Sequence, residues 1–174
     1  MTAIRPLPSQ QELCERLTYI PDTGVLTWNY MPSFPPQWNG KWAGRRAGSE
    51  LHADGRLSIT IGPRVMVAAR IIWKMVYGVD PPREVDHKDG DPANDRLKNL
   101  RLASHHQNMR NKSPHRGKDL PKGVSRCAGT DRLRASIYVD NKCQHLGMFD
   151  TPAEAHAAYC AAADKAFGEF ARHG

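Results

Sequence analysis

Alternation of apolar and polar side chains is clearest between residues 133 and 139, which read LRASIYV. One face of this segment carries Leu133, Ala135, Ile137 and Val139, and the other face carries Arg134, Ser136 and Tyr138. A period of two is typical of a strand with one buried face. DNK at 140–142 predicts a turn, CQHLGMF predicts the partner strand, and the preceding KGVSR predicts a third strand.

The last helix is predicted from the signal at its start. In TPAE, Thr151 can cap the helix, Pro152 takes the first helical position, and Glu154 can complete a capping box. The face expected to turn inward is made of small residues and one tyrosine: Ala155, Ala158, Tyr159, Ala162 and Ala166. Because small side chains allow close approach, we expect a three-stranded antiparallel sheet packed on one helix.

The N-terminal half mixes short helices and strands. Ser9 and Glu12 form a capping-box signal ahead of a helix over 10–17. VLTWNY at 25–30 alternates as a strand does, and LSITI at 57–61 follows a turn. RVMVAARIIWKMVYG predicts a strand that runs into a helix ending at Gly78. MPSFPPQWNGKWAGRRAG at 31–48 is rich in proline and glycine, which predicts a long loop.

Residues 84–112 predict the order strand, loop, strand, helix. EVDH follows a Pro-Pro pair and can form a short strand, whereas Gly90 and Pro92 break regular structure in DGDPAND. LRL at 100–102 predicts the return strand. Ser104 and Gln107 then form a capping box for a helix in SHHQNMRN. The following NKSPHRGKDLP predicts a linker.

The net charge of +7 is unevenly distributed. Residues 84–100 hold five acidic and three basic side chains, whereas residues 101–121 hold five basic and one acidic. A basic protein with one acidic island fits a polyanion binder that also gathers a divalent cation. A solvated basic surface would give the same totals, so charge leaves both interpretations open.

The composition, 40% hydrophobic and 25% charged, is that of a globular chain. No apolar run approaches the roughly 20 residues of a membrane span, and the first residues lack the apolar core of a signal peptide. We therefore expect a cytoplasmic protein without membrane attachment. The cysteines form no CxxC pair, which disfavours a zinc knuckle and fits small apolar residues in a reducing compartment: Cys14, Cys127, Cys143 and Cys160.

Four polar residues in 84–112 could form a metal-dependent hydrolytic site. Asp86 offers a carboxylate and Asn108 an amide oxygen, and hard cations such as Mg²⁺ prefer oxygen ligands. His87 suits proton removal from water near neutral pH. Asn99 could bond across the loop and hold the histidine in one orientation.

The neighbouring ionisable residues are interpreted as structural. The loop acids Asp89, Asp91 and Asp95 are expected to be turn residues, with Asp89 as the reserve metal ligand. His105 and His106 fall in the first turn of the predicted helix, where they could touch phosphate rather than metal.

This run resembles the HNH nuclease motif, in the branch whose last two motif letters are asparagines. His87, Asn99 and Asn108 match the three letters, with gaps of 12 and 9 residues. The upstream TGVLTW and RIIWKMVYG also resemble the leading region of phage homing endonucleases, although Ala69 stands where the family often has a histidine before the arginine. The resemblance implies a ββα-metal fold with one Mg²⁺ or Mn²⁺ ion on Asp86 and Asn108, His87 as general base and a structural Asn99.

GV, ASI, HLGMF and TPAEAHAAY, spread across about 121–171, resemble the APETALA-type (ethylene-response-factor) DNA-binding domain. Such domains lay their sheet in the major groove. The positions matching that surface are Lys122, Ser125, Arg132, Ser136, Tyr138, Cys143 and His145. Several differ from the arginines and tryptophans of the plant pattern, so no sequence preference carries over. An ordinary solvated sheet face is the alternative. With the basic linker included, the expected DNA contacts are Arg110, Lys112, Arg116, Lys118, Lys122, Arg126, Arg132, Arg134, Tyr138, Lys142 and His145.

The residues and resemblances together predict an α+β protein in three parts. These are an HNH nuclease region over 1–112 with leading β-hairpins and its core motif at 84–112, a basic linker over 113–120, and a DNA-binding domain over 121–174. The expected activity is that of a homing-type endonuclease nicking double-stranded DNA in a bacterial or phage-infected cell. Two alternatives stay open: a DNA-binding regulator with a vestigial HNH site, and a phage or defence HNH nuclease without homing.

Overall fold

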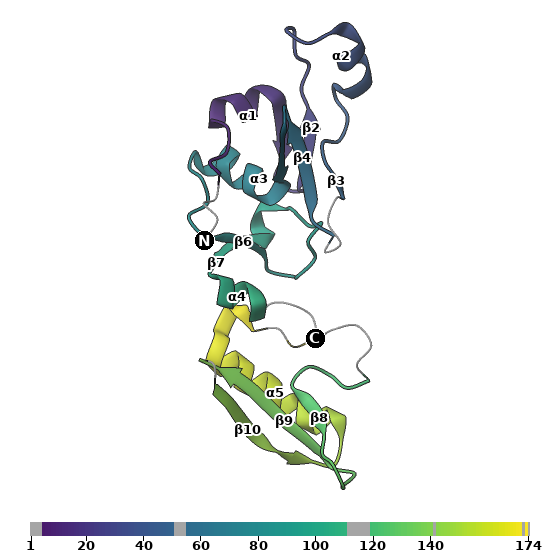
Figure 1. The fold of residues 1–174 in the computed structure, drawn as a ribbon, viewed down its shortest axis with the longest axis vertical. Coiled ribbons are helices and arrows are strands. Elements are labelled where there is room, and N and C mark those ends of the chain that lie inside the picture. Colours follow the sequence, from purple (N-terminus) through teal and green to yellow (C-terminus); the bar gives the residue numbers. More distant parts are fainter. Residues whose placement is uncertain (1–4, 51–54, 111–118, 141, 172, 174) are drawn as a thin grey trace. The chain divides into compact units, whose positions relative to one another are not determined.

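The computed structural model describes residues 5–50, 55–110, 119–140, 142–171 and 173. It divides into two units, residues 1–104 and 105–174, and each is described by itself (Figure 1). Helices and antiparallel strands occur in both units, which is compatible with the predicted α+β class.

The first unit is built from short elements. Its helices are α1 (Gln10–Arg16), α2 (Pro36–Trp42) and α3 (Ala68–Tyr77), with a 3₁₀ turn η1 (Leu97–Asn99). β1 (Leu17–Ile20) pairs with β2 (Val25–Trp28), and β6 (Glu84–His87) pairs with β7 (Leu100–Ala103). A third antiparallel sheet has the order β3 (Ser49–Glu50), β4 (Leu57–Ile61), β5 (Arg64–Val67).

Helix α3 organises the core of this unit. It contacts α1, β4 and β5, and its buried residues are Ala68, Ala69, Ile71, Ile72 and Met75. Burying one isoleucine or leucine contributes about 1.5–3 kcal/mol, so this apolar face accounts for much of the unit's stability. The helix ends at Gly78, whose φ of 75° is the left-handed conformation that glycine adopts without strain. The predicted helix and its end are confirmed.

The loop predicted over 31–48 is wrong in part, because α2 lies within it. Pro36 tolerates the first helical position, where a backbone N–H would have no helical partner. The Asn39 side chain accepts from the Met31 N–H and donates to the Met31 carbonyl, both at 2.8 Å. Trp38 packs edge-on against two aromatic neighbours. These contacts hold a helical turn that local propensity disfavours.

The β6–β7 hairpin and the loop between its strands carry the candidate site. Its register pairs Asp86 with Arg101 and His87 with Leu100. Val85 and Leu100 are buried in the core that α3 organises, which anchors both strands. The strand, loop and return strand predicted from residues 84–102 are confirmed.

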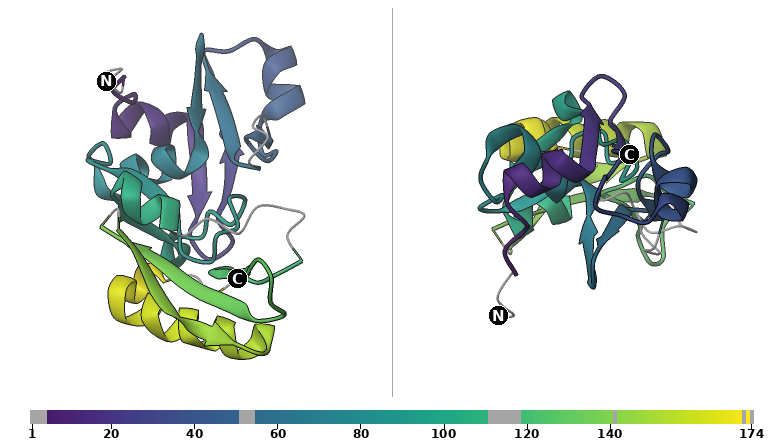
Figure 2. Two further views of the ribbon diagram at one scale, coloured as in Figure 1. Left: turned by 60° about the horizontal axis from the view of Figure 1, so that its bottom comes forward. Right: turned by 90° about the horizontal axis from the view of Figure 1, so that it is seen from above.

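The second unit begins with α4 (His105–Arg110). Its sheet has the order β10 (Lys142–Phe149), β9 (Leu133–Val139), β8 (Val124–Arg126), and all pairs are antiparallel. Figure 2 shows α5 (Pro152–Phe167) lying along one face of this sheet, and a 3₁₀ turn, η2 (Gly168–Phe170), follows it. The capping box of Thr151 and Glu154 is present, as predicted.

The buried stripe of α5 only partly matches the prediction. Ala155, Tyr159 and Ala163 are buried, Ala158 and Ala162 are partly buried, and Ala166 is exposed. Residues spaced by four lie on the same side of a helix, so Ala163 lies on the same side as Ala155 and Tyr159. A Cβ at Gly123 would lie 2.0 Å from the Tyr159 ring, so this close approach requires glycine.

The basic linker predicted at 113–120 lies mostly outside the described residues, which resume at Asp119. Leu120 packs against the core of the second unit.

Candidate active site

Two ionisable residues are buried at the end of β6. Asp86 and His87 are 5% and 6% exposed. Because an isolated buried charge is strongly unfavourable, such groups need polar partners. The partners come from β7 and from the loop that joins the two strands.

Asp86 forms a buried ion pair with Arg101. The Arg101 Nε donates to Asp86 Oδ2 at 2.9 Å, and the two residues are directly opposite across the hairpin. Charges at opposed positions of antiparallel strands meet in this way. The sequence pattern predicts both strands but not their register, so it gives no sign of Arg101 as the partner of Asp86.

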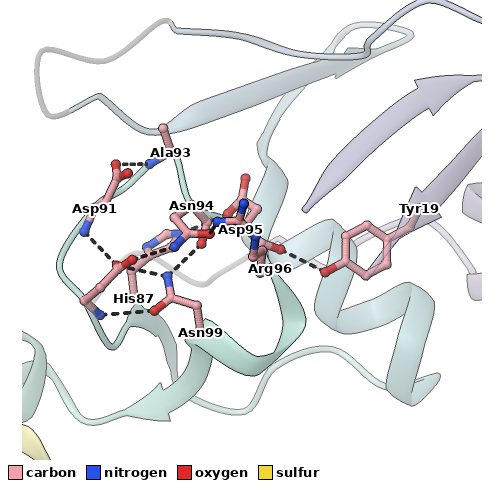
Figure 3. A network of polar contacts seen from close by, with 9 residues as sticks. Tyr19, His87, Asp91, Ala93, Asn94, Asp95, Arg96 and Asn99 are labelled. Atoms are coloured by element: carbon pink, nitrogen blue, oxygen red, sulfur yellow. Dashed lines mark hydrogen bonds and ion pairs between the residues drawn. The ribbon is translucent and has the colours of Figure 1, made fainter. Parts of the chain in front are cut away.

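His87 is paired with Asp95 rather than with Asn99. The His87 Nε2 and Asp95 Oδ1 atoms are 2.9 Å apart, and Asp95 is only 2% exposed (Figure 3). An ionised carboxylate only accepts hydrogen bonds, so Nε2 carries the hydrogen in this pair. The sequence predicts a turn residue at Asp95, and the structure instead buries its carboxylate against the histidine. Asp95 differs from the loop acids Asp89 and Asp91 because it is buried and they are exposed. The local sequence pattern does not predict this burial.

The described hydrogen bonds of Asn99 hold the loop together. Asn99 Oδ1 accepts from the Asp89 N–H at 3.1 Å, while its Nδ2 donates to Asp89 Oδ1 at 2.9 Å and to the Asn94 carbonyl at 2.7 Å (Figure 3). Asn99 therefore closes the loop that also carries Asp95, the partner of the histidine.

Asp89 has a lowered pKa within this loop. Burial alone would raise the pKa, but hydrogen bonds from the Asp91 N–H and from the Asn99 and Asn94 side chains favour the ionised form and outweigh it. The carboxylate is thus used as an acceptor that closes the turn, which agrees with its interpretation as a turn residue.

The β1–β2 hairpin braces the same loop. The Tyr19 hydroxyl donates to the Asp95 carbonyl at 2.8 Å, and burial together with the Asp95 charge raises the pKa of Tyr19 to about 12 (Figure 3). A Cβ at Gly24 would lie 2.6 Å from the backbone of Asp95 and Arg96. The TGVLTW segment therefore supports the site through direct packing.

A small cleft of about 170 Å³ opens beside His87. Its lining includes Arg56 and Arg70, from the start of β4 and from α3, together with Glu84. Guanidinium groups bind phosphate well because their donors form a planar fork. The cleft therefore gives Arg70, whose role the sequence left open, a place next to the histidine.

Asn108 is buried and lies on α4, at the start of the second unit. The structure thus brings Asp86, His87 and Asn99 into one hairpin, while the convergence of Asn108 with Asp86 remains a proposal. His105 and His106 on the same helix are exposed.

The donor types fit a hard divalent cation. Across the described part of the chain, no cluster of three His, Cys, Asp or Glu residues could hold a metal ion. Mg²⁺ does not require one, because it keeps several waters and commonly binds one or two protein oxygens plus a substrate phosphate. The carboxylate of Asp86 and the amide oxygen of Asn108 are ligands of that kind.

The second unit presents an open sheet face opposite α5. Arg134 and Tyr138 of β9 are exposed, and His145 of β10 lies on the same face because it pairs with Ser136. Lys142 and Arg126 are exposed too, but they pair with Val139 and Leu133, which belong to the apolar face. The face opposite α5 therefore carries Arg134 and His145, but not Lys142 or Arg126.

Two expected DNA contacts of this unit are less open. Lys122 is only partly exposed. The Arg132 Nε donates to Asp150 Oδ1 at 3.1 Å, and its Nη2 donates to the Met148 carbonyl. Four further predicted contacts concern side chains outside the described residues: Arg110, Lys112, Arg116 and Lys118.

One segment of the chain matches a known family model. Residues 67–110 match a family model described as HNH endonuclease. A search of curated proteins found no match. The matched segment runs from the end of β5 through α3 and the β6–β7 hairpin to α4, and it supports a nuclease that acts on nucleic acid. In the described ranges, no helix combines the length and the apolar character needed to cross a membrane.

Proposed function

We propose that this protein is a divalent-metal-dependent DNA endonuclease of the HNH homing type, which nicks double-stranded DNA at a site chosen by its C-terminal module. The observation that carries the proposal is the buried His87–Asp95 pair beside Asp86 at the end of β6. These residues lie within the segment matched by the HNH endonuclease model.

His87 serves as the general base. Its Nε2–H donates to Asp95, which holds the ring in one tautomer, so Nδ1 is the nitrogen that takes a proton from the attacking water. A carboxylate that orients an imidazole also stabilises the imidazolium formed when the proton arrives. Asp95 is therefore a positioning residue, and Tyr19 and Asn99 keep its loop in place.

Arg70 and Arg56 bind the scissile phosphate in the cleft beside His87. Their positive charges favour the phosphate group as negative charge builds on it during attack. They also fix its position relative to the imidazole.

Asp86 and Asn108 would hold one Mg²⁺ or Mn²⁺ ion. When bound, the ion supplies Lewis-acid stabilisation of charge on phosphate oxygens and on the leaving 3′ oxygen. Arg101 orients the Asp86 carboxylate through their 2.9 Å contact. Its positive charge also limits how much negative charge the site carries.

The second unit supplies DNA binding. Exposed Arg134 and His145, on the sheet face opposite α5, support contact with phosphates or guanine edges. The resemblance to APETALA-type domains favours the major groove as the place of the sheet.

A plasmid-nicking assay on the full chain tests this function. Conversion of supercoiled to open-circular DNA is measured with Mg²⁺ or Mn²⁺, with and without chelator. Nicking should require the ion, and His87→Ala should lower its rate on the order of 10²–10⁴-fold. His173→Ala, which removes an exposed histidine near the chain end, is the matched control and should keep the parent rate.

Equal rates for His87→Ala and the parent would exclude this role of the histidine. DNA binding without cleavage in either metal would favour the regulator with a vestigial site. Run-off mapping of cuts on both strands of a candidate target then separates a nick from a double-strand break. Locating the gene in an intron or between genes separates homing from defence.

A further inference from the structure

A pocket of the first unit lies near α2, apart from the cleft beside His87. Its volume is about 610 Å³, within the range of ligand sites. Figure 1 shows α2 at the end of this unit opposite the β6–β7 hairpin. Four aromatic residues line the pocket: Trp28, Phe34, Trp38 and Trp42. The nuclease mechanism uses none of them.

The aromatic rings contact one another edge-on and form part of the walls of the pocket, and Trp28 also packs against the core of the unit. Trp38 meets Trp28 and Phe34 edge-on, with ring centroids 5.7 Å and 4.8 Å away and interplanar angles of 79° and 81°. Trp42 is 38% exposed, although a tryptophan of no function would gain by burial. Such walls suit a flat aromatic ligand, which gains by stacking on them.

The charge around the pocket is positive. Arg16 and Arg46 both line it. The Arg16 guanidinium lies 5.4 Å from the centre of the Phe34 ring and also pairs with Glu12 at 3.3 Å. No acidic residue is among the described lining residues. The sequence from 23 to 49 contains three basic residues and no acidic one. A ligand with an anionic group is therefore favoured over a neutral or cationic one.

Ser58 supplies an independent sign of a ligand. It lines the pocket and is 1% exposed, and its hydroxyl has no hydrogen-bond partner in the described part of the structure. Buried hydroxyls are usually paired, because leaving one unsatisfied costs free energy. A ring nitrogen or carbonyl oxygen seated against Ser58 would satisfy it.

We infer that this pocket binds an unstacked nucleotide of a DNA strand, with the base against the tryptophans and the phosphate at Arg16 and Arg46. Base stacking on aromatic rings is tolerant of sequence and is a common mode of single-strand binding. The inference rests on the proposed function only in taking DNA as the source of the nucleotide.

Tryptophan fluorescence reports directly on this pocket. Three of the four tryptophans of the chain line it, and Trp73→Phe removes the other. The probe is a single-stranded oligothymidylate of about ten nucleotides, in the range of known single-strand sites, titrated with chelator present. We expect saturable quenching by this strand and weaker quenching by a blunt duplex of equal length. A thymidine monophosphate titration distinguishes a strand site from a site for free nucleotides.

Two substitutions assign the binding to the pocket. Loss of one stacked base costs a few kilocalories per mole, so Trp38→Leu should weaken strand binding between about 5- and 150-fold. Arg46→Gln should weaken it and lower its salt dependence. Arg45→Gln is the matched control for charge, since Arg45 is adjacent and exposed but does not line the pocket. Tyr30→Leu is the control for loss of an exposed aromatic ring.

The inference is overturned if the strand leaves pocket fluorescence unchanged, or if Arg45→Gln weakens binding as much as Arg46→Gln. Quenching by thymidine monophosphate as tight as by the strand, or by a proline-rich peptide but not by DNA, would overturn it too. If Trp38→Leu does not fold, the titration of Trp73→Phe and the comparison of Arg46→Gln with Arg45→Gln still test the inference. If the strand quenches the fluorescence as expected but the protein never cuts plasmid, the pocket inference stands and the proposed nuclease function fails.

Discussion

Asp95 is the residue on which the candidate active site most depends beyond the HNH letters. It is one of five acids between residues 84 and 100, and its neighbours in the loop are exposed or close turns. Asp95 reaches the imidazole because the loop turns its carboxylate into the hairpin while Tyr19 holds its backbone.

Asp95→Asn is predicted to lower the nicking rate on the order of 10²–10⁴-fold. The amide can present its NH₂ to the ring and so favour the wrong tautomer. Single-turnover nicking measures the rate, and DNA affinity is measured separately. Asp91→Asn is the control, since its carboxylate accepts from the Ala93 N–H in the same loop. Affinity and rate falling together would point to a general structural defect instead.

Asp89 gives a pH prediction. Its folded pKa is below the ordinary 3.8, so the ionised form is favoured in the folded loop. Its contribution to stability is therefore complete above the ordinary pKa and is lost as pH falls through the lowered one. The melting temperature of the parent should fall more steeply than that of Asp89→Asn as acid is added below about pH 5. Parallel curves would contradict this role.

At the scale of elements, close packing of α5 on its sheet depends on glycine as well as on alanine. The backbone at Gly123 has φ 81° and lies against the Tyr159 ring. Gly129 has a similar φ of 77° but nothing within 4 Å of an added Cβ. The two positions separate backbone strain from steric overlap.

Gly129→Ala should cost about 1–2 kcal/mol for the left-handed backbone alone. Gly123→Ala should cost that amount plus about 1–3 kcal/mol for overpacking against Tyr159. Urea unfolding followed by circular dichroism measures both. If both substitutions lower the free energy of unfolding equally, α5 and the sheet can move apart near Gly123 at no measurable cost.

At the scale of the whole molecule, the acidic loop between β6 and β7 and the sheet face that carries Arg134 are proposed to have different functions. The net charge of +7 steers a polyanion toward the protein, while the acids around the hairpin serve local hydrogen bonding and the proposed ion. Salt dependence of DNA binding is the observable that reports the basic face.

Arg134→Gln is predicted to weaken duplex binding and to reduce the slope of log affinity against log salt by about 0.9. Lys165→Gln makes the same charge change on an exposed position of α5, the helix on the other side of the sheet, and should leave the slope unchanged. Fluorescence anisotropy across a salt series with chelator present provides the slopes. Equal reductions would assign the effect to net charge alone.

The sequence by itself indicated many of the elements and several of their ends, but not α2 or β3. Ser9, Thr151 and Gly78 act on their own neighbours, and alternation in 133–139 depends on a single burial face, so these features are local. The HNH motif residues His87, Asn99 and Asn108 are recognisable for the same reason, because their spacing can be read from one short segment of the sequence.

Only the tertiary structure decided which side chains meet. Asp86 finds Arg101 through strand register, His87 finds Asp95 through the folding of a loop, and α2 persists because Trp38 and Asn39 have partners. Each depends on burial and on contacts between residues far apart along the chain. A local sequence pattern can indicate candidate residues, but tertiary packing determines which of them are in contact.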